Sequence, residues 1–241
     1  MFAMNWVIGL FIPLAMAVSG HAQLGHEIAA KHAARAGERL AALTALRAEG
    51  RMFIGDEVLP FILVAQRPDR LRVESFTAQR RVVQGYDGVG APWTTQSDVR
   101  AGAPQEMTAA EAKDFIANAD FDGPLMNYAA KGYSVDYAGE DVLEGRKAYK
   151  LLLMSKSDDI FFLWVDAGTS EVVKRTVYRQ FDTQRVAVDT FFKDFRPVGG
   201  VLQPFRVETT ANGRTLYVML IDKLEANPAP IPPGTFARPG G

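Results

Sequence analysis

Histidine and cysteine, the side chains that most often carry acid–base, nucleophilic and metal chemistry near neutral pH, are scarce in this sequence. The three histidines are His21, His26 and His32, and there is no cysteine. His26 and His32 lie on an expected helix at a spacing that separates them by about 240° around its axis, so they do not form a metal-binding pair. We therefore expect no metal ion, no cofactor and no thiol chemistry, and binding is favoured over catalysis.

Paired carboxylates are the remaining candidates for acid–base catalysis. The pairs are Asp120 with Asp122, Glu140 with Asp141, and Asp158 with Asp159. All lie at predicted turns or helix ends, where Asp and Glu are common for structural reasons. The sequence has no nucleophile elbow, no phosphate loop and no zinc-type spacing. We predict that the protein is not an enzyme; a secreted hydrolase that uses a serine or a carboxylate is the less favoured alternative.

The overall charge of the chain gives no indication of a strongly charged binding partner. The 27 Lys and Arg residues balance 28 Asp and Glu residues, so no global field attracts nucleic acid or an anionic membrane surface. Hydrophobic residues make up 48% of the chain and charged residues 23%, which is ordinary for a globular protein with a sizeable core. We expect a monomer that does not bind nucleic acid.

The first 22 residues have the pattern of a secretory signal. They carry no charge, they contain an apolar run over residues 6–18, and Gly20 and Ala22 supply small residues for signal peptidase. A retained membrane anchor is the competing interpretation, but the run is shorter than the roughly 18–20 residues that span a bilayer. We predict a signal peptide over residues 1–22, cleaved after Ala22, and a single domain over residues 23–241.

The rest of the chain alternates between polar and apolar residues, as antiparallel strands do. An alanine-rich segment, residues 24–43, first shows helical spacing. Strands are then predicted at 45–54, 58–66, 70–76, 81–86, 133–139, 147–154, 160–166, 172–179, 186–194, 203–209 and 216–224. Their short connections favour antiparallel neighbours, because a parallel crossover needs a dozen or more residues. The expected fold is one long antiparallel meander.

The centre of the chain interrupts this meander. Residues 108–111, TAAE, form a capping box that predicts a helix through Asn118, followed by the apolar segment 121–128. Strands 61–65, 151–154 and 160–165 are apolar at consecutive positions, which predicts that both faces of the sheet are covered. The helix and the segment after it then act either as a movable lid over an apolar cavity or as a structural plug; from the residues alone, both interpretations stay open.

Several pieces of the chain, in this order, resemble the LolA-like outer-membrane lipoprotein-sorting proteins. They are AGERL (36–40) with the strand at 46–53, YDG (86–88) with Trp93, FDGPLMNYAAKGYSVDYAGEDVLEGRKAYKLLL (121–153), WVD (164–166) before VVK (172–174), FR (195–196) with GGVLQP (199–204), and NP (227–228) with FARP (236–239). The resemblance covers almost the whole chain after the predicted signal peptide. It implies an α+β fold, mainly antiparallel β: a strongly curved, half-open β-barrel with an N-terminal helix and a short helical lid or plug in its concave face.

The resemblance also implies a function. Such proteins are periplasmic carriers that accept acylated cargo, a lipoprotein or a lipid, from an inner-membrane donor and deliver it to an outer-membrane acceptor. A regulatory sensor of lipids or lipoproteins with the same fold is the alternative. The candidate residues for the lining of the ligand cavity are Trp93, Phe115, Phe121, Leu125, Met126, Phe162, Trp164 and Phe192. For each of these side chains taken alone, ordinary core packing is favoured over contact with a ligand.

Overall fold

The computed structural model describes residues 15–77, 79–97, 102–156, 159–181 and 184–240. Within them lie two helices, α1 (Ala15–Ala41) and α2 (Ala109–Ala119). The strands are β1 (Ala45–Ile54), β2 (Glu57–Gln66), β3 (Arg70–Phe76), β4 (Arg81–Tyr86), β5 (Trp93–Ser97), β6 (Gln105–Glu106), β7 (Tyr133–Leu143), β8 (Arg146–Ser155), β9 (Ile160–Asp166), β10 (Val172–Phe181), β11 (Gln184–Val198), β12 (Val201–Ala211) and β13 (Arg214–Ala226).

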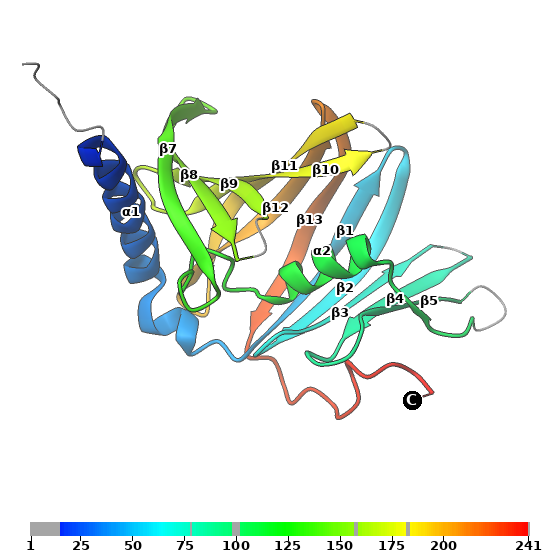
Figure 1. Ribbon diagram of the computed structural model, residues 1–241. Helices are drawn as coiled ribbons and strands as arrows, with labels where there is room; N and C mark the ends of the chain where they lie inside the picture. Colours follow the sequence, from blue (N-terminus) through cyan, green and yellow to red (C-terminus); the bar gives the residue numbers. More distant parts are fainter. Residues whose placement is uncertain (1–14, 78, 98–101, 157–158, 182–183, 241) are drawn as a thin grey trace, which may run out of the picture.

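All of these strands belong to one antiparallel sheet with the order β6-β5-β4-β3-β2-β1-β13-β12-β11-β10-β9-β8-β7. The sheet does not close, because β6 and β7 are its two edges. Figure 1 shows it curving from β5, around β13, to β7, with α2 between the two walls. The predicted mainly antiparallel, curved and half-open barrel is confirmed. The short strands β5 and β6 were not predicted as strands.

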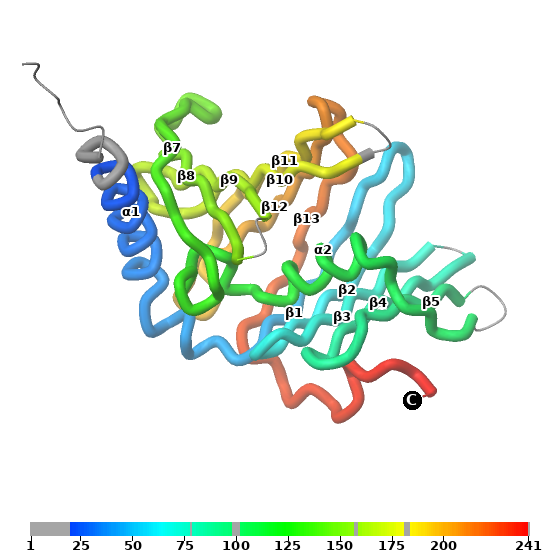
Figure 2. Tube along the Cα trace, in the orientation of Figure 1, coloured from blue at the N-terminus to red at the C-terminus, as the bar shows by residue number. Residues whose placement is uncertain are grey.

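The strand register separates two faces of this sheet. Leu163 of β9 pairs with Arg175 of β10, and Ala65 of β2 pairs with Leu71 of β3. These positions lie on the side that the two helices cover, and we call it the inner face. The opposite side is the outer face. Residues 235–236, near the C-terminus, lie on the outer face beside β3–β5, as Figure 2 also shows.

Both helices pack their apolar sides onto the inner face. Ile28 and Ala29 of α1 contact a cluster of buried side chains from β7, β8 and β9. In α2, Phe115 and Ala119 pack on Ala65 and Leu71 of the other wall. The inner face is therefore buried in three clusters, one under α1, one under α2 and one where the end of α1 meets β1 and β12, and side chains of the segment that follows α2 pack against all three.

The helix boundaries differ in part from the sequence prediction. In α2 the predicted capping box is present, since Thr108 and Glu111 exchange both hydrogen bonds. By contrast α1 begins at Ala15, not at residue 24, and runs through the predicted cleavage position with a kink at Gly37, whose φ is 52°. Residues 1–14, which hold most of the predicted apolar signal, lie outside the described residues, so cleavage stays a prediction. Among the described residues, no helix is long and apolar enough to cross a membrane.

Candidate functional site: a two-part cavity on the inner face

An apolar pocket of about 240 Å³ lies where α1, the segment after α2 and the inner face meet. Its apolar lining comes from both helices, from the segment after α2 and from β9–β12: Ala36, Leu40, Ala117, Phe121, Pro124, Leu125, Leu163, Val172, Phe192, Phe195, Val201, Leu202 and Pro204. Polar side chains that also line it are His32, Asn118, Asp120, Asp122, Glu171, Arg175 and Gln203. A mainly apolar pocket with a few polar groups at its rim is the usual form of a small-molecule site.

A second cavity, the polar cleft, adjoins the apolar pocket. It measures about 490 Å³ and lies between α2 and strands β8–β11. Its polar lining includes Lys113, Asp114, Lys131, Asp159, Arg179 and Arg185. The two cavities share Ala117, Asp120, Pro124 and Arg175, so these four residues form the boundary between an apolar compartment and a charged one.

Arg67 fastens the segment after α2 to the end of α1. Its Nη2 donates to the Leu40 carbonyl at 2.9 Å, and its Nε donates to the Leu43 carbonyl at 2.6 Å. The same guanidinium makes two hydrogen bonds to Asp122 and lies 4.8 Å from the centre of the Phe121 ring. One side chain on the β2–β3 connection therefore holds the floor of the apolar pocket in place.

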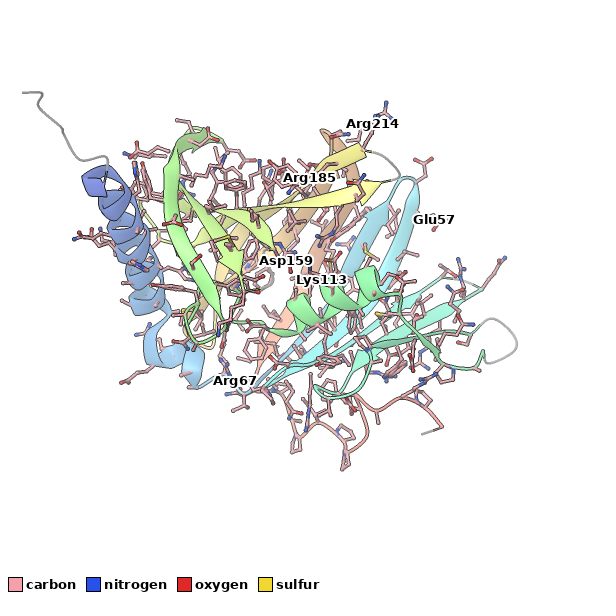
Figure 3. The ribbon with its side chains drawn as sticks, viewed as in Figure 1. Glu57, Arg67, Lys113, Asp159, Arg185 and Arg214 are labelled. Carbon is pink, nitrogen blue, oxygen red and sulfur yellow. The ribbon has the colours of Figure 1, made fainter. Side chains whose placement is uncertain are left out.

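Three ion pairs tie the polar cleft together. Arg179 of β10 pairs with Asp114 of α2. Lys113 of α2 pairs with Asp159, and Figure 3 labels these two residues beside each other. Lys131 pairs with Asp120 and also donates to the Gly123 carbonyl at 2.7 Å. The first two pairs connect α2 to the β8–β10 wall, and the contacts of Lys131 join two parts of the segment after α2. Pairs of this kind with solvent on one side contribute little each, so they can open at small cost.

Burial shifts the pKa values of three side chains that line the apolar pocket. It raises the pKa of Asp120, which the Lys131 ammonium partly counters, and it raises the pKa of Glu171 in spite of Arg35 at 3.8 Å. Burial also lowers the pKa of His32, although its Nδ1 lies 2.8 Å from the Ser170 carbonyl. The low-dielectric pocket thus favours the neutral form of each of these groups.

The structure brings three of the predicted cavity residues together. Phe121, Leu125 and Phe192 line the apolar pocket from two sides. Phe115 and Met126 lie next to it but pack into its walls. Phe115 is buried against β2 and β3, and Met126 packs on the cluster that joins α1 to β1 and β12.

The other three predicted residues lie on the outer face. Trp93 is buried against Gly85, and its indole N–H donates to the Phe236 carbonyl at 3.3 Å. Phe162 and Trp164 flank Lys150, whose ammonium lies 4.3 Å from the Phe162 ring centre. The structure therefore places them outside both cavities described above.

Sequence reasoning missed the polar members of the site, above all Arg67 and Arg175. Nothing in the sequence singles out Arg67, because only the fold shows that it reaches the Leu40 and Leu43 carbonyls. Arg175 is one of several charged residues in an ordinary alternating strand. The signal for Arg175 was an arginine on the side of a strand that faces the interior of a curved sheet. That side can be recognised only when the strand register is known.

No protein-family model matches this sequence, and no curated protein matches it either. Solved structures with a similar fold do exist. A DUF1329 family protein from Desulfovibrio piger is 13% identical, with a TM-score of 0.60 over 90% of this chain and 97% of that one. A domain assigned to the outer membrane lipoprotein-sorting proteins, from Vibrio parahaemolyticus, is 12% identical, with a TM-score of 0.60 over 89% and 97%.

A LolA superfamily protein from Nitrosomonas europaea is 13% identical, with a TM-score of 0.56 over 86% of this chain and 94% of that one. At these identities the likeness concerns the fold, and the function needs arguments from the site. The chain has the LolA-like fold, as its sequence pieces suggested.

Proposed function

We propose that this protein is a periplasmic carrier that binds an acyl chain in the apolar pocket and shields it from water between two membranes. The observation that carries the proposal is the pocket itself, an apolar compartment held between α1, the segment 121–125 and the inner face of the sheet. The cargo is a lipid or the acyl part of a lipoprotein. The LolA-like fold, which the Vibrio parahaemolyticus sorting domain shares, supports this class of cargo.

The energetics of transfer fit such a pocket. Burial of one CH₂ group contributes about 0.8 kcal/mol, so a chain of about 16 carbons gains roughly 12 kcal/mol on leaving water. A bilayer offers the same gain, so a carrier must match the membrane and need not exceed it. A lining of Phe, Leu and Val side chains offers the same gain per CH₂ to the part of the chain that the pocket holds, without any covalent step.

The route that we propose begins with export through the N-terminal signal and cleavage after Ala22. An inner-membrane donor then loads the monomeric carrier, and an outer-membrane acceptor unloads it. N-terminal sequencing of protein recovered from the periplasm tests the first step. A chain that still starts at Met1 and sediments with membranes would contradict a soluble carrier.

Filling the pocket tests the binding step. Ala36 of α1 lines the apolar pocket, whereas Ala34 of the same helix is exposed to solvent. We expect Ala36→Trp to reduce the affinity for a fluorescent fatty-acid probe about tenfold or more, because the indole occupies the space of the chain. The matched variant Ala34→Trp should bind as the wild type does. Equal binding by all three proteins would place the acyl chain elsewhere.

A direct test identifies the cargo. Mature protein purified from the native periplasm without detergent is extracted, and the extract is analysed by mass spectrometry. Acyl-bearing molecules should be recovered in a stoichiometric amount, and much less should come with Ala36→Trp. A wild-type extract free of acyl chains, together with a protein that binds no probe, would refute the carrier function.

A further inference from the structure

Arg175 of β10 lies at the boundary between the apolar pocket and the polar cleft and lines both. Its pairing with Leu163 places it on the inner face, in the wall opposite α2. It is the basic side chain that the two cavities have in common among the residues described. Any elongated molecule that extends from one cavity into the other passes its guanidinium.

The hydrogen-bonding capacity of this guanidinium is largely unused. Its Nε is shielded from solvent and has no partner among the described residues, and its Nη2 reaches the Asn118 Oδ1 only at 3.5 Å. No carboxylate of the described chain lies within ion-pair distance of it. Two carboxylates that line the polar cleft with it are already paired, Asp114 with Arg179 and Asp120 with Lys131.

An arginine in this position is costly for the protein alone. A buried polar atom without a hydrogen bond and a charge without a counterion both destabilise the folded state, so native proteins seldom keep them without a reason. A guanidinium offers five N–H donors in a planar fork that matches the oxygens of a carboxylate or a phosphate. The missing partner is therefore an anion that the chain does not supply.

We propose that Arg175 binds the anionic head, a carboxylate or a phosphate, of an amphiphile whose acyl chain lies in the apolar pocket. This inference deepens the proposed function and rests on it. The chain of the ligand fills the space between Phe121, Leu125 and Phe192, and its head meets Arg175 where the polar cleft begins. Arg185, which lines that cleft without a carboxylate partner among the described residues, adds positive charge along the path of the head.

Three ligands with the same twelve-carbon chain test the proposal: dodecanoate, dodecyl phosphate and dodecanol. We expect the wild type to bind the two anions at least about tenfold more tightly than the alcohol, since a charge-assisted pair in a low-dielectric site discriminates strongly. Arg175→Gln should lose this preference and keep its affinity for dodecanol. Comparison of the two anions then distinguishes a free fatty acid from a phosphate-bearing lipid as the source of the head.

Controls separate a local effect from a general loss of positive charge or of folding. Arg214, on the β12–β13 hairpin away from both cavities, gives the matched variant Arg214→Gln, which should bind all three ligands as the wild type does (Figure 3). Arg175→Lys keeps a charge and should retain part of the preference. The melting temperature of ligand-free Arg175→Gln should equal or exceed that of the wild type, because the variant removes an unpaired charge.

The outcomes also separate this inference from the function on which it rests. If the wild type binds dodecanol and dodecanoate equally well, or if Arg175→Gln keeps the preference for anions, the assignment of Arg175 is wrong while acyl-chain binding stands. If the wild type binds none of the three ligands, the carrier function itself is refuted.

Discussion

Arg67 shows how one side chain can hold two parts of the pocket wall. Its guanidinium donates to the Leu40 carbonyl in the last turn of α1 and to the Leu43 carbonyl just beyond the helix, and it pairs with Asp122 beyond α2. Its charge also lies over the face of Phe121, a favourable cation–π arrangement. The pocket's shape thus depends on a polar residue that does not line it.

Replacement of Arg67 by alanine should destabilise the fold by about 2–3 kcal/mol, because it removes the donor of the Leu43 carbonyl and leaves the mostly buried Asp122 carboxylate without its partner. Chemical denaturation of the two proteins measures the difference. Arg51 provides the control, since it makes the same two-bonded contact with Asp222 on the exposed surface. Arg51→Ala should have little measurable effect. Equal losses in the two variants would show that the contacts of Arg67 do not stabilise the fold.

His32 should make the stability of the protein sensitive to mild acid. Burial holds its pKa in the folded chain below the value of 6.5 that it has when exposed. As the pH falls from about 7.5 to about 5.5, the unfolded chain therefore takes up a proton that folded His32 resists, and stability is lost. Relative to His32→Asn, which keeps an N–H donor for the Ser170 carbonyl, the wild type should lose at most about 1.4 kcal/mol per pH unit.

Denaturation curves at several pH values check this expectation, and the difference between the two proteins cancels the titration of groups that they share. Glu171 borders the same pocket, and burial raises its pKa, which acts in the opposite sense at lower pH. The comparison is therefore repeated in a Glu171→Gln background. Parallel pH profiles of wild type and His32→Asn in both backgrounds would mean that His32 titrates alike in the folded and unfolded chains.

At the scale of elements, α2 and the segment after it have different roles. Phe115 of α2 packs in a core with Ala65 and Leu71, whereas Phe121 lines the apolar pocket and lies beneath Arg67. The sequence left the choice between a lid and a plug open for this whole region. The packing indicates that α2 anchors the region and that the segment after α2 supplies most of the region's contribution to the lining of the apolar pocket.

Truncation of these two aromatic side chains should separate the two roles. We expect Phe115→Ala to cost about 3–5 kcal/mol of stability, as loss of a buried ring usually does. Phe121→Ala should cost less, and it should change the affinity for a fluorescent fatty-acid probe more than it changes folding. Denaturation and probe titration of the same samples give both values. If both variants lose stability alike and the wild type binds no probe, the region is a plug and covers no ligand.

The elements were far more predictable than the site. Strands such as β3 (Arg70–Phe76) and β9 (Ile160–Asp166) match the predicted ranges, because alternation and turn residues mark their ends. The face that a residue occupies is harder to predict. Strand β9 is apolar at consecutive positions, so its sequence pattern does not distinguish the outward-facing Phe162 and Trp164 from their inward-facing neighbours. In β10, an irregularity between Val172 and Lys174 shifts the strand register just before Arg175.

At the scale of the whole molecule, the half-open sheet gives the cavity two walls that are joined on one side by continuous strands. The β1–β5 wall carries α2, and the β7–β10 wall carries α1 (Figure 1). On the open side, the two walls meet through side-chain contacts of α2, including the Lys113–Asp159 and Asp114–Arg179 pairs. Entry of a ligand past these contacts requires them to separate, and their exposure makes that inexpensive.

A reversible cross-link across this opening tests the route. The chain has no cysteine, so Lys113→Cys with Asp159→Cys supplies a single pair of thiols. Joining them with a short, reducible bismaleimide should slow the uptake and release of a fluorescent fatty acid about tenfold or more, because α2 can no longer leave the β8–β9 wall. Reduction of the linker should restore the rates, and the uncross-linked variant should exchange the probe as fast as the wild type. Stopped-flow measurements that give equal rates before and after cross-linking would show that the ligand enters elsewhere.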